Sequence, residues 1–126
     1  MIKVEFKELV GNDRRQFFRV APSVEEPILL KTQAGMFPLI EISGGGCRLP
    51  IAAQAPIQES AEQLLAFPGR SKPITVNVRS VIVDEKSIGV EFVGLDEEMR
   101  EIICGYVRTR ELELVRRFRT RAMTAS

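Results

Sequence analysis

The stretch from Ile74 to Val83 constrains the fold of this chain more than any other, because its side chains alternate between apolar and polar as in a half-buried β-strand. A polar turn at 84–87 follows, and Ile88–Val93 then forms a second apolar run, so the two runs predict an antiparallel hairpin. The apolar positions change parity near Ser80, which predicts a β-bulge or a buried strand end at that point.

Shorter apolar runs, each bounded by turn residues, precede this hairpin. We expect strands over 27–33, 36–42 and 47–51, a loop over 52–61, and a strand or a helical turn over 62–67. Pro38 cannot donate a hydrogen bond to a neighbouring strand, so its strand is expected at a sheet edge or a bulge. Several short strands joined by turns predict a closed or sandwiched antiparallel β-unit.

A helix is expected after the strands. Asp96 can cap its N-terminus, and apolar side chains recur at helical spacing from Met99 to Val107. Further apolar side chains continue the stripe, so the helix is predicted to end near residue 119. Gly105 is a weak point within it, costing about 1 kcal/mol relative to alanine.

The C-terminal part of the predicted helix is basic. Six arginines lie between Arg108 and Arg121 against Glu111 and Glu113, so this stretch carries +4, whereas the whole chain carries +1 and the remainder therefore −3. Only Phe118 lies among these arginines, which is too little aromatic surface to stack bases, so a nucleic-acid partner is disfavoured. We expect this helix to pack on the barrel or to join two copies in a homodimer.

Composition restricts the possible chemistry. A length of 126 residues predicts one domain, and 44% hydrophobic with 28% charged residues is ordinary for a globular protein. The chain has no histidine, which removes the commonest general base and the commonest metal ligand. Cys47 and Cys104 are far apart and form no CxxC pair, so no zinc site is predicted. We expect neither a metal site nor catalytic residues, and therefore a binding protein rather than an enzyme.

Cysteine usage and the N-terminus indicate the compartment. The two cysteines are expected to be buried free thiols in a reducing environment. Residues 1–10 lack the apolar core of a signal peptide, and no apolar run approaches the roughly 20 residues of a membrane span. A cytoplasmic location is expected.

Three arginines surround two phenylalanines in Asp13-Arg-Arg-Gln-Phe-Phe-Arg19, just before the first predicted strand. The spacing of Arg15 and Arg19 lets both guanidinium groups reach one region if the segment is extended or looped. A guanidinium can bind a phosphate or the O6/N7 edge of guanine with two hydrogen bonds, and it can stack on a purine. Taken alone, such a cluster is also typical of solvated charges beside a phenylalanine anchored in the core.

A second motif, Glu41-Ile-Ser-Gly-Gly-Gly46, follows a predicted strand. Glu41 offers an acceptor for N–H donors, Ser43 offers a hydroxyl, and the glycines permit close approach of the backbone to a flat ligand. No lysine follows the glycines, so the motif is not a phosphate-binding P-loop. The alternative interpretation is a glycine-rich turn that binds nothing.

In this order the two motifs resemble those of the PilZ domain family, bacterial receptors for the dinucleotide second messenger cyclic di-GMP. The family pattern is RxxxR, then about twenty residues, then [Asp/Asn]-x-Ser-x-x-Gly; here it corresponds to Arg14-Arg15-x-x-x-Arg19 and Glu41-x-Ser43-x-x-Gly46. The strand over 88–93 and the acidic start of the helix continue the resemblance, which covers roughly residues 13–106. It implies a mainly β fold, a six-stranded antiparallel β-barrel with a C-terminal α-helix.

The resemblance also implies a division of the chain and a ligand site. Residues 1–12 would be an N-terminal segment, 13–107 the barrel and the start of the helix, and 108–126 a basic helix extension and tail. The arginines would hold phosphates and guanine edges, while the hydroxyl, the carboxylate and the glycine backbone would receive a base. The implied cyclic di-GMP site consists of Arg14, Arg15, Arg19, Glu41, Ser43, Gly45 and Gly46. The liganded protein would act on a partner protein that controls motility, adhesion or biofilm formation, with no other cofactor.

Glu41 departs from the family pattern, because it stands where the family has Asp or Asn. The extra methylene must fold back or push a guanine outward, and a misplaced charge-assisted hydrogen bond costs about 1.5–3 kcal/mol, roughly 10- to 150-fold in affinity. The alternative function is therefore a degenerate PilZ adaptor that binds no nucleotide and acts through protein–protein contacts in pilus or flagellar machinery.

Overall fold

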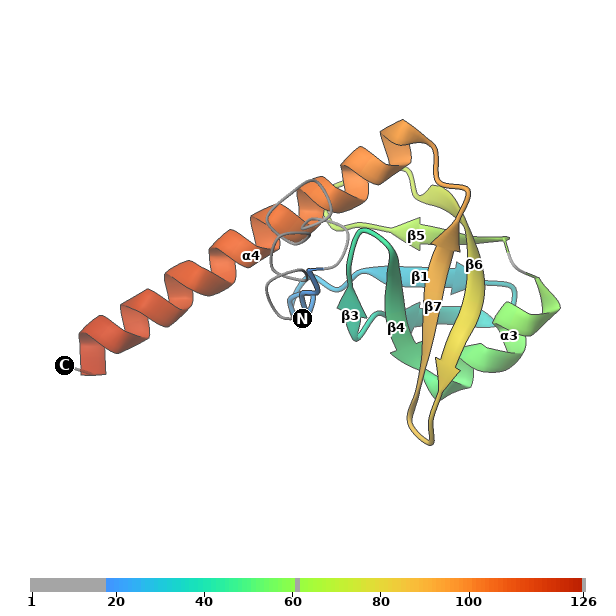
Figure 1. Ribbon diagram of the computed structural model, residues 1–126, viewed down its shortest axis with the longest axis horizontal. Helices are drawn as coiled ribbons and strands as arrows, with labels where there is room; N and C mark the ends of the chain where they lie inside the picture. The colour runs from blue at the N-terminus through green and yellow to red at the C-terminus, as the bar shows by residue number, and fades with distance from the viewer. Residues whose placement is uncertain (1–17, 61, 126) are drawn as a thin grey trace, which may run out of the picture.

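The molecule is a curled antiparallel β-sheet with a long C-terminal helix (Figure 1). The computed structural model describes residues 18–60 and 62–125, with side chains as far as Phe118. The strands are β1 (Leu29–Thr32), β2 (Gly35–Pro38), β3 (Glu41–Ile42), β4 (Gly46–Pro50), β5 (Glu62–Ala66), β6 (Ile74–Val83) and β7 (Ser87–Val93). The described helices are the 3₁₀ turn η1 (Ile51–Ala53), the short helix α3 (Gln54–Glu59) and the long helix α4 (Glu97–Ala125).

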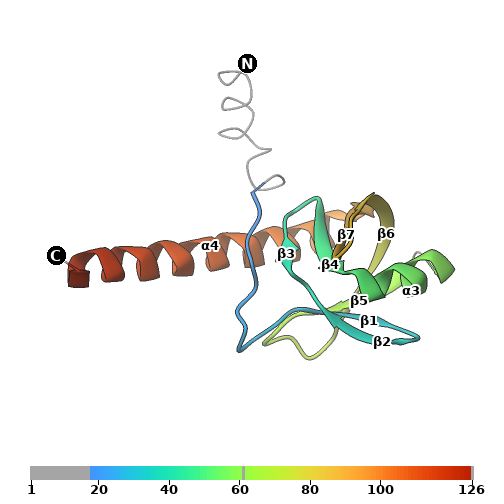
Figure 2. The same ribbon diagram turned by 90° about the horizontal axis from the view of Figure 1, so that it is seen from below.

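The strands form one sheet in the order β2-β1-β5-β6-β7-β4-β3. β2 and β3 are consecutive in the chain, yet they stand at opposite ends of that order. The N–H of Leu39 donates to the carbonyl of Ile28 at 2.9 Å, and the N–H of the next residue, Ile40, donates to the carbonyl of Arg48 at 2.8 Å. The chain thus changes strand partners between β2 and β3, which curls the sheet into a half-barrel (Figure 2).

The predicted strand over 36–42 is therefore two strands, and the described sheet has seven strands where the resemblance implied six. β2 contains no buried residue, whereas Leu39 and Ile42 are buried three residues apart, so burial changes parity between the two pieces. All side chains over 36–42 except Glu41 are apolar, so the sequence pattern does not reveal the change of strand partner. Pro38 ends β2 at the edge of the sheet, as its missing N–H predicted.

The prediction of a loop over 52–61 is wrong for most of its length. η1 and α3 occupy 51–59, and they bury Ala53 and Ile57, four residues apart, in the barrel core. Two buried side chains are too few to give a helical pattern in the sequence, and tertiary packing supplies the stabilisation that the local pattern lacks. The segment 62–67, left open between strand and helical turn, is a strand over Glu62–Ala66.

The hairpin predicted over 74–93 is present as β6 and β7. Its turn is closed by Asp84, whose Oδ1 accepts the N–H groups of Lys86 at 2.9 Å and Ser87 at 2.8 Å. The pairing shifts by one residue between Ser80 and Ile82, which confirms a bulge where the parity of the sequence changes.

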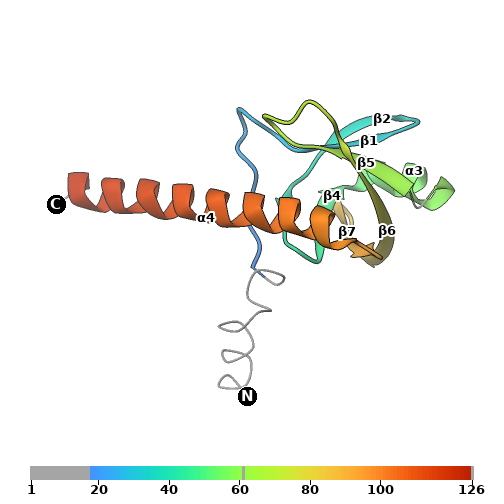
Figure 3. The same ribbon diagram turned by 90° about the horizontal axis from the view of Figure 1, so that it is seen from above.

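The long helix begins as predicted, because Asp96 Oδ1 accepts the N–H of Met99 at 2.8 Å. Ile103 and Val107 are fully buried against the barrel core. α4 runs to Ala125, six residues past the predicted end, and its C-terminal half projects away from the barrel (Figure 3). Within the part of the chain that the structure describes, no helix combines the length and apolar character needed to cross a bilayer.

Candidate functional site

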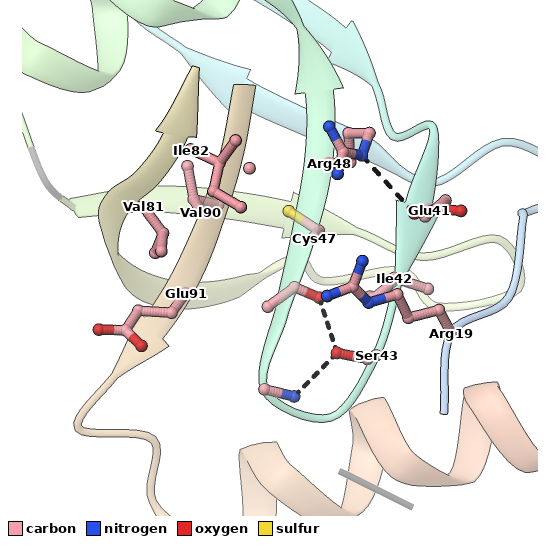
Figure 4. Close-up of a pocket in the computed structure, with 13 residues that line it drawn as sticks. Arg19, Glu41, Ile42, Ser43, Cys47, Arg48, Val81, Ile82, Val90 and Glu91 are labelled. Atoms are coloured by element: carbon pink, nitrogen blue, oxygen red, sulfur yellow. Dashed lines mark hydrogen bonds and ion pairs between the residues drawn. The ribbon is translucent and has the colours of Figure 1, made fainter. Parts of the chain in front are cut away.

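A pocket of about 290 Å³ lies between the β3–β4 hairpin and the β6–β7 hairpin (Figure 4). Five residues of the predicted site line it, namely Arg19, Glu41, Ser43, Gly45 and Gly46. The two remaining predicted residues, Arg14 and Arg15, lie outside the described residues. The pocket thus brings the Glu41–Gly46 motif together with Arg19, the last residue of the arginine motif.

The two motifs are brought together by backbone pairing. Val20 and Ile42 form an isolated antiparallel bridge, in which each N–H donates to the other residue's carbonyl, at 3.0 and 2.9 Å. Arg19 precedes Val20, so the bridge fixes it beside the motif that contains Ile42. The side chain of Arg19 is exposed and reaches from the N-terminal segment toward β4 (Figure 4).

Ser43 uses its polar groups within its own turn. Its N–H donates to the carbonyl of Gly46 at 2.8 Å, and its Oγ accepts the N–H of Gly45 at 3.2 Å. The hydroxyl also donates to the carbonyl of Gly46 at 3.4 Å. A hydroxyl oxygen has two acceptor sites, so one acceptor site remains beyond these contacts. The sequence analysis did not predict that Ser43 stabilises this turn.

Gly46 is required by the sheet itself. A Cβ built at this position would lie 2.1 Å from the carbonyl oxygen of Val90, because β4 passes that close to β7. The carbonyl of the preceding residue, Gly45, accepts the N–H of Phe92 at 2.9 Å and extends the same contact. Positive φ, the usual reason for glycine in a turn, occurs in the described residues at Gly35, Gly69 and Gly94 and not in this motif.

Glu41 faces a cation that the sequence analysis did not identify. It is paired in register with Arg48 across the hairpin, and Arg48 Nε lies 3.6 Å from Glu41 Oε1. The signal was available, because a four-residue turn over 43–46 places residue 41 opposite residue 48. Both side chains are partly exposed, at 27% for Arg48 and 40% for Glu41.

Arg48 also connects the pocket to the β6–β7 turn. Its guanidinium donates to Ser87 Oγ at 2.8 Å and lies 3.7 Å from Asp84 Oδ2. The pKa of Asp84 is lowered, chiefly by the N–H groups of Lys86 and Ser87, with the Ser87 hydroxyl and the charge of Arg48 adding smaller effects. Asp84 therefore stays ionised and helps to fix the position of Arg48.

The wall formed by β6 and β7 is largely apolar. Val81 and Ile82 line the pocket, although their side chains are 58% and 55% exposed. They are consecutive residues at the bulge, so the usual alternation of strand faces is interrupted there. Glu91, on the same wall, forms an ion pair with Arg79. Arginines on one side and aliphatic side chains on the other suit a ligand with anionic groups and a flat apolar surface.

Cys47 lies in the pocket lining but is not suited to nucleophilic chemistry. Its thiol is buried, and burial raises its pKa to about 12, so it stays protonated at neutral pH. Cys104 is also buried, and neither cysteine forms a disulfide, as predicted for both. Among the described residues, no group of three or more cysteine and acidic side chains is placed to hold a metal ion.

Comparison with known proteins identifies the domain type of this chain. The family model described as the PilZ domain matches residues 13–108. A search of curated proteins finds no match.

Three solved structures illustrate the similarity of fold. The MrkH–c-di-GMP complex of K. pneumonia has a TM-score of 0.57 at 19% identity, with 79% of this chain and 53% of MrkH covered. YcgR of Escherichia coli, in complex with c-di-GMP, has a TM-score of 0.56 at 18% identity, with 90% and 51% covered. An uncharacterised Legionella protein has a TM-score of 0.55 at 16% identity, with 82% and 99% covered. The chain thus spans about half the length of MrkH and YcgR.

Proposed function

Because this chain belongs to the PilZ domain family, we propose that it is a receptor for cyclic di-GMP that relays the nucleotide signal to a partner protein. The partner would be one that controls motility, adhesion or biofilm formation. Recognition of the dinucleotide is by binding and involves no catalytic step. The residues that we propose to contact it are Arg14, Arg15, Arg19, Glu41, Ser43, Gly45 and Gly46.

The observation that carries the proposal is the meeting of Arg19 with the Ser43–Gly46 turn at the pocket. The Val20–Ile42 bridge holds them together through two backbone hydrogen bonds, so their proximity does not depend on side-chain conformation. MrkH and YcgR, which share the fold, were solved with c-di-GMP bound. Their ligand is the one that the arginines and the glycine-rich turn of this chain are suited to bind.

The pocket lining matches the two kinds of surface on the ligand. Cyclic di-GMP presents two phosphates, which pair with guanidinium groups through charge-assisted hydrogen bonds. It also presents two guanines, whose flat faces can cover the exposed aliphatic surface of Val81 and Ile82. Arginine keeps its charge at physiological pH, so binding by this route does not depend on a titrating group.

Glu41 would accept hydrogen bonds from guanine N–H groups while its carboxylate remains paired with Arg48. Oε1 faces Arg48, and the second carboxylate oxygen can accept a hydrogen bond from a base. The longer side chain of glutamate reaches Arg48 from a position that the family fills with Asp or Asn. This competition weakens the contact with guanine without removing it.

A second candidate function follows from the same ion pair. If Arg48 withdraws Glu41 from the pocket altogether, the chain would be an adaptor that binds no nucleotide and acts through protein contacts in pilus or flagellar machinery. The exposed apolar residues of α4, such as Leu112 and Phe118, would then supply a contact surface.

Calorimetric titration of the full chain with cyclic di-GMP separates the two candidates. The receptor predicts saturable heat that is lost in the Arg15→Ala/Arg19→Ala double variant. Arg70→Ala is the matched control, since Arg70 is exposed on a turn and does not line the pocket. Absence of heat at high micromolar ligand, with circular dichroism proving a folded sample, would exclude the receptor and leave the adaptor.

A further inference from the structure

α4 extends well beyond the barrel that it packs against. Among the side chains that the structure describes, which extend to Phe118, the last buried one is Arg110, whose Nε donates to the carbonyl of Ala21 at 2.9 Å. The apolar side chains that follow are exposed: Leu112 by 52%, Leu114 by 38%, Val115 by 42% and Phe118 by 75%. A projecting helix has little stability of its own, because most helical stability comes from packing of an apolar face. We therefore expect the exposed half of α4 to pack against another protein surface.

The charges of α4 are separated along its length. Residues 96–101 contain four carboxylates and one arginine, whereas residues 108–121 contain six arginines and two glutamates. The helix dipole favours this polarity at the first and last turns, but its effect is confined to those turns. The basic stretch is longer than one turn, and the two ends of a single straight helix cannot approach each other. Two antiparallel copies would place each acidic end beside a basic end.

One face of α4 has the spacing that pairing of two helices requires. Positions separated alternately by four and three residues lie on one side of a helix that pairs with another. On the outer side of α4 these positions are 101, 105, 108, 112, 115 and 119. The first five carry exposed residues, although the first three lie in the part of the helix that packs on the barrel by its other side.

Gly105 gives this face room for a close approach. The residue is exposed, and a Cβ built on it would meet nothing within 4 Å. In an antiparallel pair centred on position 110, Gly105 stands opposite Val115, and position 101 stands opposite position 119. A glutamate then faces an arginine at both ends of the overlap, which spans about 28 Å at 1.5 Å per residue.

We propose that α4 is a self-association helix, through which two copies of this chain pair antiparallel about a two-fold axis near residue 110. The pairing covers Leu112 and Val115 and neutralises the acidic start of each helix with the basic end of the other. A parallel pair would set like charges side by side and is disfavoured. The pairing uses the side of α4 that faces away from the barrel, so it stands whether or not the pocket binds a nucleotide.

Sedimentation equilibrium of the full chain, at tens of micromolar and low salt, tests the proposal. The expected mass is twice the chain mass of 14.1 kDa, and raising the salt concentration should shift the protein toward monomer. A monomer at every concentration would overturn the proposal. The same result is expected if residues 1–17 of the same chain cover α4, so that alternative is also tested.

Charge reversal then tests the antiparallel arrangement. The variants Glu98→Arg/Glu101→Arg and Arg117→Glu/Arg119→Glu should each be monomeric, with melting curves proving that each is folded. Mixed in equal amounts, they should form a heterodimer, because at positions 98, 101, 117 and 119 one variant carries only arginine and the other only glutamate. Glu59→Arg/Glu85→Arg is the matched control and should remain dimeric. A dimer that survives either reversal, or a mixture that stays monomeric, would contradict the proposed pairing.

Discussion

Arg48 and Glu41 lie opposite each other on β4 and β3, with Arg48 Nε 3.6 Å from Glu41 Oε1 at the edge of the pocket. The same guanidinium donates to Ser87 Oγ at 2.8 Å. The carboxylate proposed to read a guanine is therefore tied to the turn of the β6–β7 hairpin. A ligand that binds Glu41 must compete with this contact.

Shortening Glu41 should strengthen the binding of cyclic di-GMP. Glu41→Asp moves the carboxylate away from Arg48 and restores the side-chain length that the family carries. We expect about a tenfold gain in affinity, equivalent to about 1.4 kcal/mol, in calorimetric titration. Glu62→Asp, an exposed position on β5 outside the pocket, should leave affinity unchanged. An unchanged or lower affinity for Glu41→Asp would mean that Arg48 does not restrain this site.

The apolar wall should contribute to affinity without supporting the fold. Val81→Ser/Ile82→Ser removes aliphatic groups that are already more than half exposed, so the free energy of unfolding should change little. Affinity for cyclic di-GMP should fall about tenfold, since each buried CH₂ is worth about 0.8 kcal/mol. Val83→Ser is the control, because Val83 is 46% exposed but does not line the pocket. Equal affinities for the two variants would exclude contact of the ligand with the bulge.

Replacement of Gly46 should damage the barrel rather than the ligand site alone. In Gly46→Ala the new methyl group would overlap the Val90 carbonyl, so β4 and β7 must separate. The free energy of unfolding in urea should fall by about 3 kcal/mol or more. The control is Gly105→Ala, in open space within α4, which should raise that free energy by about 1 kcal/mol at high dilution. A Gly46→Ala variant as stable as the parent would contradict the observed approach of the two strands.

Arg110 should hold the segment after the RxxxR motif against α4. Arg110→Leu removes the hydrogen bond from its Nε to the carbonyl of Ala21, so the free energy of unfolding should fall by about 2 kcal/mol. Amide hydrogen exchange should quicken at residues 20–23 and in α4 beyond residue 110. Arg100→Leu, at an exposed position of the first turns, should reproduce neither effect. Unchanged exchange at residues 20–23 would show that Arg110 does not hold this segment.

Asp84 should make the fold sensitive to acid. Its pKa in the folded chain is lowered, so its contribution to stability is complete above the ordinary value of 3.8 and is lost as the pH falls toward the lowered value. Urea unfolding between pH 2.5 and 6 should show stability declining in the acidic part of this range. The stability of Asp84→Asn should decline less over this range than that of the parent, whereas Glu85→Gln, in the same turn, should decline as much as the parent. Parallel pH profiles for the parent and Asp84→Asn would contradict this role.

The local elements of the fold were predictable because their signals lie between neighbouring residues. Alternation over 74–83, the polar turn at 84–87 and the change of parity near Ser80 predicted the hairpin and its bulge. Asp96 marked the start of α4 through the hydrogen bond that it makes to the first turn. In the same way, the spacing of two motifs indicated the family that the domain match identifies.

Other features were decided by contacts between residues distant in the chain. The split of 36–42 into β2 and β3 follows from a change of strand partner, and the helix over 54–59 from burial of Ile57 in the barrel. The Val20–Ile42 bridge, which places Arg19 beside Ser43, joins residues with no common pattern in the sequence. A periodic sequence specifies which side of an element is buried but not what covers it, and that choice depends on the free energy of the assembled core. The sequence by itself therefore determined the β6–β7 hairpin, its bulge and the start of α4, because their signals are local. Only the tertiary structure decided that α3 forms, that Glu41 meets Arg48 and that α4 leaves the barrel (Figure 1).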